Sequence, residues 1–360
     1  MLKIILPTIL FLHGIIHIVG FVKSVRPNAV KVLKEPISAM QGFFWLLAGI
    51  LFLSGAVFLY LDINLNWAFL LPAIILSQVL LILNWKEAKY GTVVNLIVVF
   101  IVIVSFSTWQ FRKTYEDEVK ENLSQASYYG SEMLSMDDVR ELPEPVIRYL
   151  EYTHSIGKPK VNHFEVSFTG RIRAKKSNEW MPFKSEQNNF MHDPTRLFFM
   201  DAVMKHLPVA GYHHYLKGVA AMDIRLLSLF TVQYFDGEEM NVAETVTFFN
   251  DMCIMAPATL IDKRISWEQL SDDSVKAKFS YKDITISAIL VFNNEGALIN
   301  FISDDRFNFE EKRRMRWSTP ITEYREINGY RLGAFAKTVY KYDDDEFAYG
   351  EFELKSIKLN

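Results

Sequence analysis

The chain of 360 residues is poor in cysteine and carries no excess of basic residues. Its single cysteine, Cys253, excludes an internal disulfide and any cage of cysteines around a metal ion. Its 39 lysine and arginine residues are outnumbered by 42 aspartate and glutamate residues, which argues against nucleic acid as a main partner. A nucleophile elbow, a glycine-rich phosphate loop, a metal-ligand cluster and a specific carboxylate pair are also lacking. These absences leave few classes of enzyme open.

Charges are scarce over the first 110 or so residues, where four long apolar segments occur. A membrane span needs about 20 mostly apolar residues to cross about 30 Å of hydrocarbon. Residues 4–22, 42–61, 67–83 and 93–108 meet this requirement, although the third segment is the shortest and contains Pro72 and Gln78. The first segment has the start of a signal peptide but no cleavage site, so we expect it to be retained. Residues 1–110 are thus predicted to form a transmembrane region of four helices.

The distribution of lysine and arginine between the short loops predicts the orientation. The loop at 23–41 and the loop at 85–90 lie on one side of the membrane if all four segments span it. Together they carry Lys23, Arg26, Lys31, Lys34, Lys86 and Lys89. We therefore expect the rest of the chain to lie outside the cytoplasm, attached to a bacterial inner membrane. An odd number of spans would reverse this orientation.

His13 and His17 are the ionisable residues that lie well inside a predicted span. Their i, i+4 spacing puts both imidazoles on one face of a helix, and such groups inside a membrane are a hypothesis of function by default. A metal ion held by the pair is one alternative, but the other spans offer no further His, Cys, Asp or Glu ligand in their cores. We favour neutral imidazoles that form hydrogen bonds with polar residues of the neighbouring spans, and no cofactor. The candidate partners are Ser54, Ser77, Gln78 and Asn95.

The remainder of the chain is predicted to be β-rich. Residues 111–134 are expected to form a juxtamembrane helical linker, and residues 135–360 an extramembrane domain. Apolar and polar residues alternate from Phe164 to Arg173 and again in several later segments, which predicts about ten antiparallel strands. An apolar helix is expected at about 238–260. The predicted fold class is membrane α-helical plus α+β, with a curved antiparallel sheet that wraps this helix.

Candidate site residues lie on this helix and just after one strand. Asp251 stands in the apolar run FFNDMCIM, where burial raises the pKa of a carboxyl group unless a cation pairs with it. Asp304 and Arg306 follow the strand at 298–303 and are candidates for that partner or for the polar floor of a cavity. Phe249 represents the apolar face that a ligand would contact. The competing interpretation places Asp251 in solvent and the second cluster at an ordinary hairpin end.

Several motifs also carry a resemblance to a known family. They are LPEPVIRYL, FTGRIR followed by EWMPF, SDDRF, and ITEYREINGYRL. With these motifs, residues 135–359 resemble a bacterial family called domain of unknown function 6544, which has no established activity and implies no catalytic residue. A curved sheet around a helix is also similar in architecture to the bacterial lipoprotein-carrier fold, which binds acyl chains between the two; fold alone does not confer function.

Three hypotheses of function follow. The first is a membrane-anchored binding protein whose extramembrane domain holds a lipid or another apolar molecule between sheet and helix, with the lipid bilayer as its other partner. The second is an enzyme with an acidic site at Asp251 and 304–306. The third is a metal-binding membrane region through His13 and His17. We favour binding over catalysis.

Overall fold

A computed structural model describes residues 2–31, 34–126, 132–343 and 345–360. The chain divides into two compact units. The first unit comprises the residues up to Lys113 together with Leu227–Leu229, and the second comprises Thr114–Leu226 and Phe230–Asn360.

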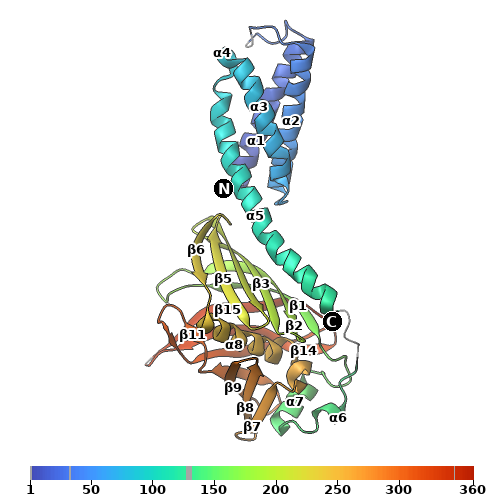
Figure 1. The fold of residues 1–360 in the computed structure, drawn as a ribbon, viewed down its shortest axis with the longest axis vertical. Coiled ribbons are helices and arrows are strands. Elements are labelled where there is room, and N and C mark those ends of the chain that lie inside the picture. Colours follow the sequence, from blue (N-terminus) through green and yellow to red (C-terminus); the bar gives the residue numbers. More distant parts are fainter. Residues whose placement is uncertain (1, 32–33, 127–131, 344) are drawn as a thin grey trace. The chain divides into compact units, whose positions relative to one another are not determined.

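The first unit is helical (Figure 1). Its elements are α1 (Leu2–Val25), α2 (Ala39–Tyr60), α3 (Asn66–Leu83), the short α4 (Trp85–Ala88) and the first part of α5 (Gly91–Ala126). Four of these helices, α1, α2, α3 and α5, are long and apolar enough to cross a membrane. All four predicted spans are therefore helices, including the third, which contains Pro72. The chain is a membrane protein.

Small residues let α1 and α2 pack closely, as is common between helices in a membrane. A Cβ atom added at Gly14 would lie 3.1 Å from the carbonyl oxygen of Gly49, and one added at Gly20 would collide with the indole of Trp45. At one end of this unit the backbone N–H of Lys34 donates a hydrogen bond to Glu87 (2.8 Å). This bond joins the loop before α2 to α4, so the two lysine-rich loops lie on the same side, as predicted.

The last part of α5 belongs to the second unit and confirms the helical extension predicted after the fourth span. Tyr115 packs against the rings of Phe199 and Tyr212, at 5.5 and 5.7 Å between centroids. The hydroxyl of Tyr212 donates a hydrogen bond to Glu118 (2.6 Å). The end of α5 thus covers one face of the neighbouring strands. Part of the predicted linker at 111–134, residues 127–131, lies outside the described residues.

The second unit is built on one antiparallel sheet of thirteen strands. Their order is β6-β5-β4-β3-β2-β1-β15-β14-β13-β10-β9-β8-β7, and the sheet does not close, so β6 and β7 are its edges. The strands are β1 (His163–Ile172), β2 (Met181–Phe190), β3 (Thr195–Met204), β4 (Leu207–Leu216), β5 (Val219–Leu226), β6 (Phe230–Phe235), β7 (Ile265–Gln269), β8 (Ser274–Tyr281), β9 (Ile284–Phe292), β10 (Leu298–Ser303), β13 (Trp317–Ile327), β14 (Tyr330–Lys341) and β15 (Glu346–Leu359). A small hairpin, β11 (Phe307–Asn308) and β12 (Arg313–Arg314), stands apart. The prediction of about ten strands was too low.

The predicted apolar helix is α8 (Glu238–Met255), which is followed by a 3-10 turn, η1 (Pro257–Ile261). It contacts β4 and β5 towards one edge of the sheet and β9, β10 and β14 on the other half, so strands flank it on two sides (Figure 1). Phe249 is fully buried and stacks on Phe279 at 5.5 Å. Two short helices, α6 (Met136–Val139) and α7 (Glu144–Tyr152), complete the unit. Tyr149 of α7 donates a hydrogen bond to the carbonyl oxygen of Cys253 (2.8 Å), which confirms that Cys253 lies in the core.

Candidate functional site

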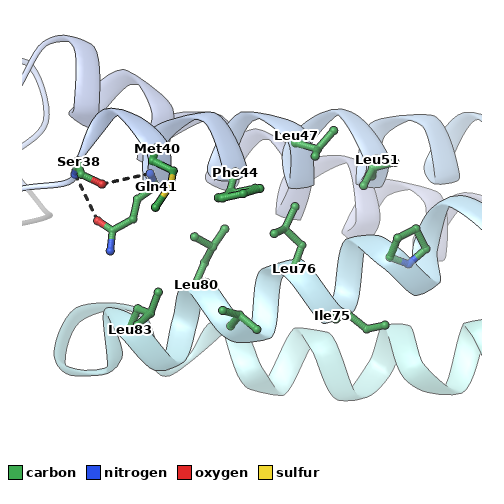
Figure 2. A pocket seen from close by; sticks show the side chains of 12 residues that line it. Ser38, Met40, Gln41, Phe44, Leu47, Leu51, Ile75, Leu76, Leu80 and Leu83 are labelled. Carbon is green, nitrogen blue, oxygen red and sulfur yellow. Dashed lines mark hydrogen bonds between the residues drawn. The ribbon is translucent and has the colours of Figure 1, made fainter.

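A groove of about 590 Å³ runs between α2 and α3 (Figure 2). Its lining is almost wholly apolar: Ser38, Met40, Gln41, Phe44, Leu47, Leu51, Pro72, Ile75, Leu76, Val79, Leu80 and Leu83. The residues from each helix recur every three or four positions, so each helix contributes one face to the groove. Leu80 is buried, whereas Met40 and Ile75 are more than half exposed. The groove is therefore a trough with an apolar floor and open sides.

Polar side chains occur at one end of this groove only. Ser38 caps the start of α2: its hydroxyl accepts a hydrogen bond from the backbone N–H of Gln41 (3.2 Å), and the side chain of Gln41 accepts one from the N–H of Ser38 (3.3 Å). Figure 2 shows this pair beside Met40, with Phe44, Leu76 and Leu80 further along the trough. Among the residues that the structure describes, no ionisable side chain lines the groove. It can hold a hydrocarbon chain but offers no group for acid–base chemistry.

A second hollow, of about 340 Å³, lies on the other unit and is basic. It is lined by Arg313, Arg314, Met315, Arg316, Lys341, Tyr342 and Asp343. Arg316 pairs with Asp304 at 2.8 Å, and this hydrogen bond lowers the pKa of the Asp304 carboxyl group. The side chain of Asp304 is 62% exposed. This predicted site residue therefore lies in a surface ion pair.

Asp251 lies instead in a buried network between α8 and the sheet. Its Oδ2 accepts hydrogen bonds from Arg196 Nε of β3 (2.7 Å) and from Gln187 Nε2 of β2 (2.8 Å). Arg196 also donates from Nη1 to Glu244 (3.1 Å) and from Nη2 to Gln187 Oε1 (3.0 Å). Two carboxylates of α8 thus share one guanidinium, and Asp251 is neither in solvent nor paired with Asp304.

Burial and charge act in opposite directions on these carboxyl groups. Burial alone would raise the pKa of Glu244, but Arg196, His213 and Arg306 together outweigh this effect, and the pKa falls to about 2. For Asp251 burial is the larger effect and raises its pKa against the attraction of Arg196. Burial also lowers the pKa of His213, which lies 3.8 Å from Glu244. Glu244 is therefore the carboxyl group of the network whose charged form is stabilised, and it forms the ion pair with Arg196.

Arg306 also contacts α8, but it bonds to other residues of this helix than Asp251. It donates hydrogen bonds to the carbonyl oxygen of Ala243 (2.9 Å) and to the hydroxyl of Thr247, and its guanidinium lies over Trp317 at 4.7 Å. Asp251 and Arg306 thus both hold α8, while Asp304 points away to Arg316. Among the described residues the contacts of Asp251, Asp304 and Arg306 do not bring the three side chains together.

The sequence interpretation missed Arg196, Gln187 and Glu244. One signal was available for Glu244, because it stands seven residues before Asp251 and so lies on the same face of α8, two turns away. Arg196 and Gln187 carried no such signal, since their partners are distant in sequence.

His13 and His17 form hydrogen bonds with the neighbouring spans, as predicted. Nδ1 of His17 donates to the carbonyl oxygen of His13 (2.9 Å), so its Nε2 accepts from the hydroxyl of Ser77 (2.8 Å). Nε2 of His13 bonds to Oδ1 of Asn95 (3.1 Å), and Asn95 donates in turn to Gln78 (3.0 Å). Within the described parts of the chain, no group of three or more His, Cys, Asp or Glu side chains is placed to hold a metal ion.

A family model described as "Family of unknown function (DUF6544)" matches residues 132–352. The chain belongs to this family. A comparison with curated proteins finds no match. Among solved structures, the crystal structure of a DUF1329 family protein from Desulfovibrio piger is similar, with a TM-score of 0.35 and 7% identity, over 60% of this chain and 91% of that chain.

The DUF6544 match separates the candidate residues into two groups. Phe249, Asp251, Asp304 and Arg306 lie inside the matched region. The α2–α3 groove and the pair of histidines precede it. Because the family has no described activity, any function has to be argued from the contacts of these residues.

Proposed function

We propose that this protein is a membrane-anchored binding protein for a lipid or another apolar molecule, and that the apolar part of the ligand lies in the α2–α3 groove. The groove itself is the observation that supports this function. Its volume of about 590 Å³ falls in the range of about 300–1,000 Å³ that is usual for ligand pockets. Because it is lined without any charged side chain, the ligand has to be apolar over most of its length.

The two ends of the groove differ, which favours an amphiphile. Ser38 and Gln41 lie at one end, where α2 begins, and hydrocarbon side chains line the rest. A single acyl chain with a polar group at one end would match this distribution. The polar group would lie near Ser38 and the chain would run along Leu47 and Leu76.

This proposal moves the ligand from the place where the sequence suggested it. Next to α8, Phe249 and its neighbours pack against aromatic rings of the sheet, and neither of the two hollows described above lies there. A ligand beside α8 would have to displace these packed side chains, which protein interiors resist. Binding in the α2–α3 groove requires no such displacement.

The groove is testable by photo-crosslinking. Full-length protein in mild detergent is incubated with a fatty acid that carries a diazirine, irradiated and digested. We expect crosslinks to concentrate on residues 40–51 and 72–83. Filling the groove with Leu47→Trp and Leu76→Trp should reduce them about tenfold, since bulky rings occupy the space that the chain needs. The matched control is Leu96→Trp, on an exposed part of α5. Crosslinks spread evenly over all lipid-facing residues would refute a specific site.

We also propose that the second unit faces the outside of the cytoplasm, in a bacterial inner membrane. The two lysine-rich loops support this orientation, because they lie on one side and short cytoplasmic loops carry the excess of basic residues. Lys355→Cys adds an exposed thiol, whereas the native Cys253 is fully buried and provides a low background. A membrane-impermeant maleimide should label this variant in intact cells. Labelling that requires permeabilised cells would reverse the orientation.

A further inference from the structure

Two neighbouring hairpins of the sheet end in exposed apolar side chains. Met204 pairs with Leu207 across the turn between β3 and β4, and they are 36% and 37% exposed. Val203, next to them, is 48% exposed, and Phe230, at the start of β6, is 54% exposed. These four residues are called the tip patch below. Because Val209 of β4 pairs with Leu226 of β5, the β3–β4 turn and the β5–β6 turn lie at the same end of these strands.

Three of the four turn residues, Lys205, Leu227 and Ser228, are of types that seldom adopt positive φ angles. Lys205 and His206 have positive φ angles of 48° and 70°, and Leu227 and Ser228 have φ angles of 56° and 53°. Asn, Asp and Gly adopt this conformation most easily, and a leucine with positive φ is unusual. Local conformation therefore does not account for an apolar side chain at the apex.

The tether between the two units keeps the tip patch near a bilayer. Trp109 marks the end of the fourth predicted span, and Tyr115, six residues later, packs against Phe199 of β3. Six residues reach at most about 20 Å, and the five from Phe199 to Met204 add about 17 Å along the strand. With the 5.5 Å between the ring centroids of Tyr115 and Phe199 and the length of both side chains included, the chain holds the tip patch within about 50 Å of the end of that span.

We infer that the tip patch is a membrane-docking surface whose apolar side chains enter the headgroup region of the bilayer. Exposed apolar clusters of this kind mark interaction sites, and the tether gives a high effective concentration of lipid, so a small patch suffices. Lys205, exposed at the apex of one turn, supplies a positive charge for anionic headgroups. This surface uses residues of the second unit, so it can fail or succeed independently of the α2–α3 groove.

Depth-dependent quenching tests this surface in the full-length protein. The variant Met204→Cys is labelled with an environment-sensitive fluorophore and placed in nanodiscs of phosphatidylethanolamine and phosphatidylglycerol that contain a nitroxide-labelled phospholipid. Lys355→Cys, an exposed position on β15, serves as the control, and the buried Cys253 stays unlabelled. We expect quenching at position 204 to be about twofold stronger than at 355, because interfacial groups sit about 5–10 Å deep. Equal quenching at both positions would overturn the inference, as would a shielded but unquenched label, which would indicate contact with a second copy.

Charge substitutions provide the second measurement. Leu207→Asp and Phe230→Asp, added to Met204→Cys, should bring the quenching down to the level of the control, because carboxylates resist entry into the headgroup region. Val219→Asp is the matched control: Val219 is 66% exposed and follows the β4–β5 turn, at the opposite end of the same strands. All these positions are exposed, so the melting temperature should stay unchanged. Quenching that persists after both substitutions would contradict membrane docking.

Discussion

The two units bury polar side chains in different ways. In the membrane unit, His13, His17, Ser77 and Asn95 are buried and bond only to uncharged groups. In the second unit, Arg196 is buried with Glu244 and Asp251 as its partners. At these two sites the first unit therefore uses uncharged hydrogen bonds, and the second uses ion pairs.

The difference follows from the solvent around each unit. Hydrocarbon cannot solvate an ion, so a charge inside a span is costly even when the protein around it relaxes. An uncharged chain of donors and acceptors avoids this cost. A domain in water can bury ions if each finds a partner, although the pair itself adds little net stability. The two kinds of contact differ when one partner is removed by mutation. A buried ion left without its partner costs much more stability than a buried amide left without one.

The largest effect should come from Arg196→Met, which removes the one cation that Glu244 and Asp251 share. Two buried carboxyl groups would then lose the guanidinium that bonds to both, and breaking a buried pair in this way costs about 3–5 kcal/mol. The free energy of unfolding of the second unit, followed by tyrosine and tryptophan signals during denaturant titration, measures this loss.

Arg314→Met is the matched control for that experiment. Arg314 forms an ion pair with Glu239 at 3.3 Å, but both side chains are nearly half exposed. Exposed pairs contribute about 0–1 kcal/mol, so little change is expected. Equal losses in the two variants would show that burial of the Arg196 network does not set its energy.

The second effect is a pH dependence that Glu244 causes. Its pKa is lowered to about 2 in the folded chain, below the value of about 4.3 for an unfolded glutamate. Glu244 therefore stabilises the fold above pH 4.3, and this contribution is lost as the pH falls from about 4.3 towards 2. Asp251, whose pKa is raised, acts in the opposite direction and reduces the net effect.

The variant Glu244→Gln isolates the contribution of Glu244 to the pH dependence from that of Asp251. The difference in unfolding free energy between the wild type and this variant should narrow by up to about 1.7 kcal/mol between pH 6 and pH 3, since each pKa unit corresponds to about 1.4 kcal/mol and pH 3 lies above the folded pKa of Glu244. Thermal unfolding of the full-length protein in mild detergent, repeated across this range, gives the measurement. A difference that stays constant with pH would mean that the Glu244 carboxylate is not stabilised by Arg196.

The sequence predicted the parts of the fold in which one local pattern is decisive. Long apolar runs identified the four spans, because a helix in hydrocarbon has to be apolar all round. Alternation identified β1, β8 and β9, each of which alternates between buried and more exposed residues. The helical spacing of apolar residues identified α8.

Strand β3 was missed for a physical reason. In β3, six residues in a row from Thr195 to Met200 are buried, because side chains of α5 cover one face and the network at α8 covers the other. A strand that is buried on both faces loses the alternation of period two. Arg196, the cation that bonds to Asp251, lies on this strand, so the candidate site was incomplete for the same reason. Long-range pairing such as that of Arg196 with α8 leaves no local signal.

The smallest effect is expected in the membrane unit, from His17→Phe. A phenyl ring keeps the volume beside Trp45 and Phe52 but removes the hydrogen bonds to Ser77 and to the carbonyl oxygen of His13. Ser77 keeps a partner in Asn95, and hydrogen bonds between spans contribute about 0.6–2 kcal/mol, so a loss of about 1 kcal/mol is expected. Unfolding of the first unit in mixed detergent micelles measures it. A loss as large as that of Arg196→Met would show that the imidazole carries a charge or a bound ion, and the contrast between the two units would no longer hold.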